Sequence, residues 1–159
     1  MPSPKKPSAV VAAEVNPRAK ASNYPEPFAT QVAGRTKRQL GEVFGLTNFG
    51  VNLTQMAPGA ISALRHWHSQ QDEFIYVLEG CVTLITDGGE TLLSAGMCAG
   101  FKAGEGDGHQ LVNRSELPAL YLEVGDRTQG DQVFYPDDDL EAYTENSQWR
   151  FRHKNGEAY

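Results

Sequence analysis

The sequence predicts an all-β fold, a barrel or sandwich of short antiparallel strands. Between about residues 28 and 136 the chain is a series of short β-type runs, separated by turn-forming residues such as those at 57–59, 87–89 and 103–108. No stretch in this region has the period of a convincing helix. We expect strands, in chain order, over residues 39–46, 50–56, 61–68, 73–80, 82–87, 90–94, 97–103, 109–115, 119–125 and 131–135.

The two ends of the chain differ in composition from this central region. Residues 1–27 are rich in Pro, Ala, Ser and Lys and lack a sustained period, so we expect a flexible N-terminal arm outside the barrel. Residues 28–136 then form the barrel domain. Residues 137–159 are acidic first and then aromatic and basic, which predicts a C-terminal extension with one short helical turn and a final strand or arm.

Composition restricts the function classes. A chain of 159 residues with 40% hydrophobic content is long enough for one domain with a core. The net charge of -6 argues against nucleic-acid binding, which needs a basic face to neutralise phosphates. We therefore interpret the basic group Arg35, Lys37 and Arg38 as solvated surface.

Cysteine usage and the lack of a leader-like segment predict a cytoplasmic protein. Cys81 and Cys98 have no CxxC spacing, so neither a disulfide framework nor a thiolate zinc site is indicated. The apolar run at residues 9–13 is too short for a signal-peptide core and is followed by Glu14. We expect no export signal and no membrane partner.

Strand geometry places two histidines on one face. Side chains alternate along a strand, so His66 and His68 point to the same side while Arg65 and Trp67 point to the other. Buried imidazoles each need a polar partner, and a shared metal ion uses a ring nitrogen of both at about 2.0–2.2 Å. The pair therefore predicts metal binding, with a satisfied core pair or polar surface as the alternative.

Two further residues complete a ligand set. Glu73 begins an apolar strand, where a carboxylate needs a cation nearby. His109 begins the run at 109–115 and meets the other ligands if that strand lies beside the one that carries His66 and His68.

The spacing of these residues resembles the first motif of the cupin superfamily. That motif runs Gly, five residues, His-x-His, three or four residues, Glu, six residues, Gly. In this chain, Gly59 is followed by six residues, His66-Trp67-His68, four residues, Glu73, six residues and Gly80. The match has one extra residue.

The second cupin motif is matched less closely. It runs Gly, five residues, Pro-x-Gly, two residues, His, three residues, Asn. Here Gly96 is followed by five residues, Lys102 in place of the proline, Gly104, four residues, His109, three residues and Asn113. Two residues are therefore added before His109.

The resemblance implies a double-stranded β-helix, the jelly-roll-like barrel of cupins, and a likeness to small single-domain bacterial cupins. Some of that group carry a sugar-phosphate-isomerase label by similarity only. His66, His68, Glu73 and His109 would bind one divalent transition metal, for which Fe, Mn, Ni and Zn remain open. Because cupins are often dimeric and exposed strands offer pairing edges, we also expect a homodimer.

Open coordination positions would suit an enzyme that acts on a small polar organic molecule, of the isomerase, lyase or dioxygenase type. Glu105 and Asp107, in the loop before His109, are the candidate catalytic residues, although solvated turn residues remain the alternative for each. A non-catalytic ligand-binding or sensor cupin is the second function that stays open. A phosphate needs Arg or Lys nearby, but Arg65 points away from the ligand face, so Lys102 is the only candidate in the motif region. This favours neutral or uncharged substrates over phosphates.

Overall fold

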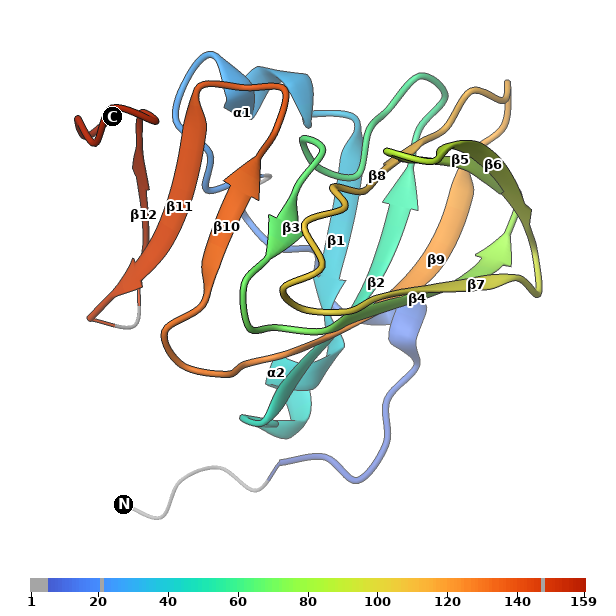
Figure 1. Ribbon diagram of the computed structural model, residues 1–159. Helices are drawn as coiled ribbons and strands as arrows, with labels where there is room; N and C mark the ends of the chain where they lie inside the picture. Colours follow the sequence, from blue (N-terminus) through green and yellow to red (C-terminus); the bar gives the residue numbers. More distant parts are fainter. Residues whose placement is uncertain (1–5, 21, 147) are drawn as a thin grey trace, which may run out of the picture.

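A computed structural model describes residues 6–20, 22–146 and 148–159 (Figure 1). The strands in these residues pair antiparallel, which confirms the predicted all-β class. Three sheets are formed. The five-stranded sheet has the order β1 (Arg35–Gln39), β2 (Phe49–Met56), β9 (Ala119–Asp126), β4 (Glu73–Glu79), β7 (Cys98–Phe101). The four-stranded sheet has the order β12 (Gln148–Arg152), β11 (Leu140–Glu145), β10 (Gln132–Tyr135), β3 (Trp67–His68). The three-stranded sheet has the order β6 (Gly89–Ser94), β5 (Cys81–Thr86), β8 (Gln110–Val112).

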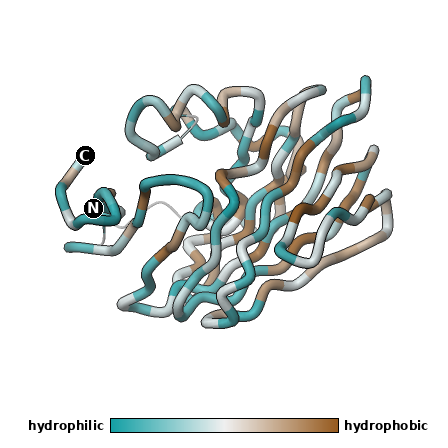
Figure 2. The backbone as a smooth tube through the Cα atoms, turned by 45° about the horizontal axis from the view of Figure 1, so that its top comes forward, coloured by the Kyte–Doolittle hydropathy of each residue, from teal (hydrophilic) through white to brown (hydrophobic). Residues whose placement is uncertain are grey.

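The sheets enclose two groups of buried hydrophobic side chains. One group centres on Met56, Val77 and Tyr121, from the five-stranded sheet, and the other on Tyr135 and Leu140, from the four-stranded sheet. Figure 2 shows hydrophobic segments along the packed strands and hydrophilic ones in the loops and end segments. Burying these side chains supplies the main driving force for closing the sheets over one another.

The expected strand over residues 39–46 is wrong. Residues Leu40–Phe44 form the short helix α2, which ends at Gly45 in the left-handed conformation with φ 67°. The amide of Leu46 donates to the carbonyl of Gly41 at 3.0 Å, a bond that closes the helix end. Glycine is the residue that adopts this conformation at least cost, so the helix stops there.

The strand in this region is β1, just before the helix. Its residues are mostly charged or polar, and side chains that face inward include Arg35 and Lys37. An apolar alternation is absent from such a strand, which is why sequence patterning placed the strand a few residues too late. The interpretation of both residues as solvated surface is also wrong, because they line an internal cavity.

The N-terminal segment contacts the barrel in its described part. A short 3-10 turn, η1 (Ala12–Glu14), precedes Arg18, whose amide donates to the carbonyl of Lys37 at 2.8 Å. Tyr24 packs edge-to-face on Tyr135, with ring centroids 5.7 Å apart, and the short helix α1 (Phe28–Gln31) follows. Residues 1–5 and 21 of the expected arm lie outside the described residues.

The C-terminal segment continues the four-stranded sheet. β11 and β12 pair with each other, and β11 pairs with β10, so these two strands extend the sheet that carries β3. Figure 1 shows β10, β11 and β12 side by side next to β3, facing the wall made of β2, β9 and β4. The divisions of the chain at residues 27 and 136 stay a prediction.

Across the described residues, the structure has no helix that is long and apolar enough to cross a membrane.

Candidate metal centre

His66 and His68 come to the site from the short strand β3 and the residue before it. His66 pairs with His109 through two backbone hydrogen bonds, of 3.1 and 2.8 Å, and His68 pairs with Val133 of β10. Both side chains are 12% exposed and point to one side, as the alternation of a strand predicts. Arg65 points away from them and binds Asp137 and Asp87.

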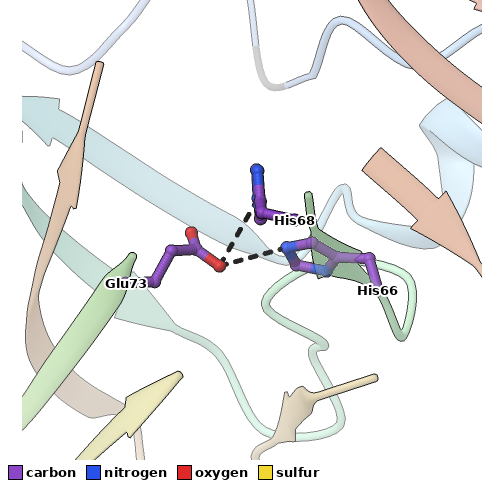
Figure 3. A group of neighbouring side chains, drawn as sticks. All are labelled: His66, His68 and Glu73. Atoms are coloured by element: carbon purple, nitrogen blue, oxygen red, sulfur yellow. Dashed lines mark ion pairs between the residues drawn. The ribbon is translucent and has the colours of Figure 1, made fainter. Parts of the chain in front are cut away.

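Three imidazoles converge on one carboxylate oxygen. Oε2 of Glu73, at the start of β4, lies 3.4 Å from Nε2 of His66, 3.5 Å from Nε2 of His68 and 2.9 Å from Nε2 of His109. Figure 3 shows the first two of these contacts, with both rings directed at the same oxygen. Donor atoms that share an ion at about 2.1 Å lie roughly 3.0–3.5 Å apart, so the spacing matches a metal site.

The structure brings together the four predicted ligands, although one is set apart from the rest. His66, His68 and Glu73 offer donor atoms that all lie within 4.8 Å of one another. His109 is not in that mutually close group, but its Nε2 is the nearest of the three nitrogens to Glu73. A small movement of its ring would be needed to join the other three around one point.

The Nδ1 atoms of His66 and His68, which face away from Glu73, each have a hydrogen-bond acceptor. Nδ1 of His66 donates to the carbonyl of Leu64 at 2.8 Å, and Nδ1 of His68 donates to Oδ2 of Asp131 at 2.6 Å. A neutral ring that donates through Nδ1 has its lone pair on Nε2, the atom that faces Glu73. Two lone pairs aimed at a carboxylate oxygen repel it, and a shared cation removes that repulsion.

His109 has a different environment. Its ring stacks on Phe101, with centroids 3.6 Å apart and an angle of 2° between the planes, and the residue is 7% exposed. Within the described residues, its Nδ1 and the buried Oε2 of Glu73 have no hydrogen-bond partner. Buried polar atoms without partners are rare, and at this site a bound ion would satisfy the carboxylate oxygen.

The local charges favour an ionised Glu73 beside a neutral His109. Burial acts to raise the pKa of Glu73, but His109 and His66 outweigh it and hold this pKa well below its ordinary value. Burial lowers the pKa of His109, and the charge of Glu73 offsets this only in part. At His68, burial acts to lower the pKa, but Asp131 and Glu73 outweigh it and raise this pKa. An ionised Glu73 and a neutral His109 are the forms that bind a divalent metal, and a bound ion would displace a proton from His68.

The metal-ligand candidates line an internal cavity of about 230 Å³, small beside the ~300–1,000 Å³ of drug-sized sites. The sheet register brings a second carboxylate, Glu123 of β9, to the same face, because Glu123 pairs with Ile75, two residues after Glu73. Glu123 accepts hydrogen bonds from Nζ of Lys37 at 2.5 Å and from Nδ2 of Asn52 at 2.9 Å.

Three cationic side chains also line this cavity: Arg18, Arg35 and Lys37. The expectation that Lys102 is the only cation near the site is therefore wrong. The missed residues precede both motifs in the chain, and the pairing of β1 with β2 brings two of them to the interior.

The candidate catalytic residues Glu105 and Asp107 lie elsewhere. They line a separate pocket of about 70 Å³, which also contacts Glu73 and His109. Glu105 is 3.8 Å from Lys102, and Asp107 accepts a hydrogen bond from the amide of Asp87 at 2.8 Å. Their catalytic role stays a prediction.

Sequence reasoning missed Asp131 and Glu123. Asp131 lies in a loop before β10, and no local signal connects it with His68, 63 positions earlier. Glu123 had a signal, because it shares the inward face of its strand with the apolar Ala119 and Tyr121. Asn113, the last residue of the second motif, is fully buried and donates to the carbonyls of Met56 and Leu117, so it has a structural role.

Comparisons with known proteins agree with this geometry. The Cupin domain family model matches residues 52–125. The crystal structure of a sugar phosphate isomerase from a cupin superfamily, from Silicibacter pomeroyi, is 40% identical, covers 95% of this chain and 96% of its own, and has a TM-score of 0.90. A proposed sugar phosphate isomerase from Acidithiobacillus ferrooxidans is 29% identical over 76% of this chain and 77% of its own, with a TM-score of 0.71.

A more distant structure shares the fold alone. The polyketide cyclase RemF from Streptomyces resistomycificus is 21% identical over 74% of this chain and 78% of its own, with a TM-score of 0.61. A comparison with curated protein sequences gave no match. The motifs, the antiparallel barrel and the extended similarity to the Silicibacter pomeroyi protein lead to one conclusion: the chain belongs to the cupin superfamily.

Proposed function

We propose that this cupin binds one divalent transition metal through His66, His68, Glu73 and His109, with Fe, Mn, Ni and Zn as the candidate ions. One observation carries the proposal: three Nε2 atoms lie within 3.5 Å of the same buried oxygen of Glu73. When bound, such an ion supplies Lewis-acid polarisation of a carbonyl or hydroxyl oxygen. The protein's own contribution is to hold the imidazoles in a fixed orientation around the carboxylate, through the acceptors Leu64 and Asp131.

The proposed activity is metal-dependent isomerisation of a small polar organic molecule. Isomerisation of a hydroxy-carbonyl compound moves a proton between neighbouring carbons, so it needs a group that takes the proton from one carbon and returns it to the other. Glu123 is placed for this role, since its carboxylate shares the cavity with the histidines. The sugar phosphate isomerase from Silicibacter pomeroyi supports the same reaction class. Lyase and dioxygenase chemistry stay open for the same ligand set.

Lys37 and Asn52 position this carboxylate. They hold Oε1 of Glu123, at 2.5 and 2.9 Å, while the hydroxyls of Tyr121 and Thr54 donate to Oε2 over the longer distances of 3.4 and 3.5 Å. An oxygen that accepts only such long hydrogen bonds can exchange one of them for a substrate proton. Glu105 and Asp107 remain the candidates on the side of the smaller pocket.

The experiment is a turnover screen of the metal-loaded protein against small hydroxy-carbonyl compounds, enols and sugars, with product followed by mass spectrometry. The isomerase proposal predicts a product of unchanged mass, formed with and without O2 and lost in Glu73→Ala. Turnover that requires O2 would indicate a dioxygenase. Tight binding without turnover in both atmospheres would favour the second function, a non-catalytic ligand-binding or sensor cupin.

We propose in addition that the protein is a cytoplasmic homodimer whose partners are small molecules, with no nucleic acid or membrane bound. The outer face of β4 supports the dimer, because Phe74, Tyr76 and Leu78 are 42%, 39% and 41% exposed. Apolar side chains grouped on a sheet face are typical of protein interfaces. Light scattering measures the mass in solution, and a monomer at micromolar concentration would contradict the dimer.

A further inference from the structure

The cavity has a wall of cationic side chains across the sheet from the histidines. Arg35 and Lys37 alternate with outward residues on β1, so both face inward beside β2. In the sheet order β1-β2-β9-β4, β1 is three strand spacings, about 14 Å, from the strand that carries Glu73. Long cationic side chains and the ligand cluster therefore enter one cavity from opposite edges.

Arg18 joins this wall from the N-terminal segment. The hydrogen bond from its amide to Lys37 fixes the segment against β1, and Arg18 lines the same cavity. Its guanidinium donates one hydrogen bond to a described residue, from Nη2 to Oδ1 of Asn23 at 2.5 Å. A guanidinium has five N–H donors, so further donors can serve a ligand.

The charges of the cavity do not balance among its described residues. The cations Arg18, Arg35 and Lys37 meet two carboxylates, Glu73 and Glu123. Glu73 faces the histidines and Lys37 is paired with Glu123, so the described lining of the cavity carries more cationic than anionic side chains. Burial lowers the pKa of Arg18, and the neighbouring charge of Arg35 lowers it further, against a smaller opposing effect of Glu123. Two like charges held close at a partly buried site are stabilised when an anion binds between them.

We propose that Arg18 and Arg35 form an oxyanion-binding subsite of this cavity, and that the substrate is a small organic molecule with one phosphate or carboxylate group. The inference rests on the proposed function for the other end of the ligand, where a hydroxyl or carbonyl group would face His66, His68 and His109. The anionic group would fix the molecule across the cavity, so that its reacting carbons lie near Glu123. Arg18 makes the N-terminal segment part of the substrate site.

The test is calorimetric titration of the full chain with inorganic phosphate, D-ribose 5-phosphate, D-ribonate and D-ribose. We expect saturable binding of inorganic phosphate, and at least one of the two sugar anions to bind roughly tenfold or more tightly than D-ribose, as expected for charge-assisted hydrogen bonds. Preference for D-ribose 5-phosphate would identify a phosphate ester, and preference for D-ribonate would identify a carboxylate. If neither inorganic phosphate nor either sugar anion binds, the subsite does not exist.

Variants locate the binding. Arg18→Gln should weaken phosphate binding roughly tenfold, and Arg18→Lys should retain part of it because the charge is kept. Arg114→Gln is the matched control, since Arg114 is 52% exposed and pairs with Glu90 on the surface. Arg35→Gln should act like Arg18→Gln, and circular dichroism would check that it folds. Native affinity for phosphate in Arg18→Gln and in a folded Arg35→Gln would overturn the proposal.

One further variant separates this proposal from the metal proposal. His66→Ala should lose metal, as measured by elemental analysis, but should still bind inorganic phosphate. If phosphate binding is lost in His66→Ala and kept in Arg18→Gln, the anion binds at the metal and the arginine subsite is wrong. If native protein lacks metal but binds phosphate through Arg18, the metal proposal fails and the subsite stands.

Discussion

Oδ2 of Asp131 lies 2.6 Å from Nδ1 of His68, and the Asp131 side chain is fully buried. The other oxygen of this carboxylate accepts hydrogen bonds from the amides of Gln70 and Gln71, at 2.9 and 3.3 Å. Burial opposes the charge of Asp131, but His68 and these amides lower its pKa below the ordinary value. Asp131 therefore acts as an ionised anchor for the orientation of the His68 ring.

Asp131→Asn should weaken metal binding about 10–100-fold, the usual effect of losing a hydrogen-bond partner behind a metal-ligating histidine. Competition with a chromophoric chelator measures this affinity. Asp139→Asn is the matched control, because Asp139 meets His153 in the same way at the surface, 2.8 Å from its Nδ1. Equal metal affinity in the two variants would show that Asp131 does not support the site.

Glu123→Gln should lower kcat about 100-fold or more, the usual size of a lost acid-base group, without changing the metal content. The reason is that glutamine keeps the shape and the contact with Asn52 but cannot accept a substrate proton. Glu105→Gln and Asp107→Asn, measured beside it under the same conditions, should have smaller effects. A larger loss in either of those two would move the proton-transfer role to the smaller pocket.

The protein should lose stability above about pH 10 through its buried tyrosines. Burial is the largest cause that raises the pKa of Tyr121 and of Tyr135 well above the ordinary value of 10.0. A folded-state pKa above the unfolded value means that the folded chain holds its protons longer. The stability is then complete below pH 10 and falls as the pH rises from there toward the folded-state values.

Urea unfolding at a series of pH values, with tyrosinate absorbance read in parallel, checks this dependence. Tyr121→Phe removes one of the two groups and should make the alkaline fall less steep. Titration of every tyrosine near pH 10 in the folded protein would contradict the prediction.

Gly45→Ala should lower the free energy of unfolding by about 1–2 kcal/mol, because the residue that ends α2 has a φ of 67°. Gly88→Ala is a suitable control, since its added Cβ would meet only the hydroxyl of Thr86, at 3.5 Å. Chemical denaturation of both variants gives the comparison. No difference between them would mean that the helix end adapts to the new side chain.

The sequence predicted the clustering of His66, His68, Glu73 and His109 better than it predicted their surroundings, for a physical reason. Strand alternation is local, so it placed His66 and His68 on one face correctly, and the motif spacing added Glu73 and His109. Alternation also indicated the strand that carries Glu73, because its inward residues Ile75 and Val77 are apolar. The strand expected over residues 61–68 is wrong for most of its length, because only Trp67–His68 forms a strand there, and His66 meets His109 in an isolated bridge.

The rule that inward residues of a strand are apolar failed at β1, whose inward side chains are charged. β1 turns Arg35 and Lys37 inward, so an apolar pattern could not reveal it, and the apolar residues of α2 were interpreted as the strand instead. Asp131 contacts His68, and Arg18 contacts Lys37, although the partners in each pair are far apart in the chain. A single sequence does not indicate such contacts unless the fold is known. Such departures from the hydrophobic pattern are expected at a functional site, because its polar side chains are placed for chemistry and not for packing.

Metal binding by the four predicted ligands is tested most directly by elemental analysis of untagged protein and of its single-ligand variants. We expect close to one transition metal per chain in the native protein. We expect strong loss of metal in His66→Ala, His68→Ala, Glu73→Ala and His109→Ala, with native content in His153→Ala, whose ring pairs with Asp139 away from the site. Native protein without stoichiometric metal after growth with Fe, Mn, Ni and Zn, or full metal content in His66→Ala and His109→Ala, would contradict this expectation.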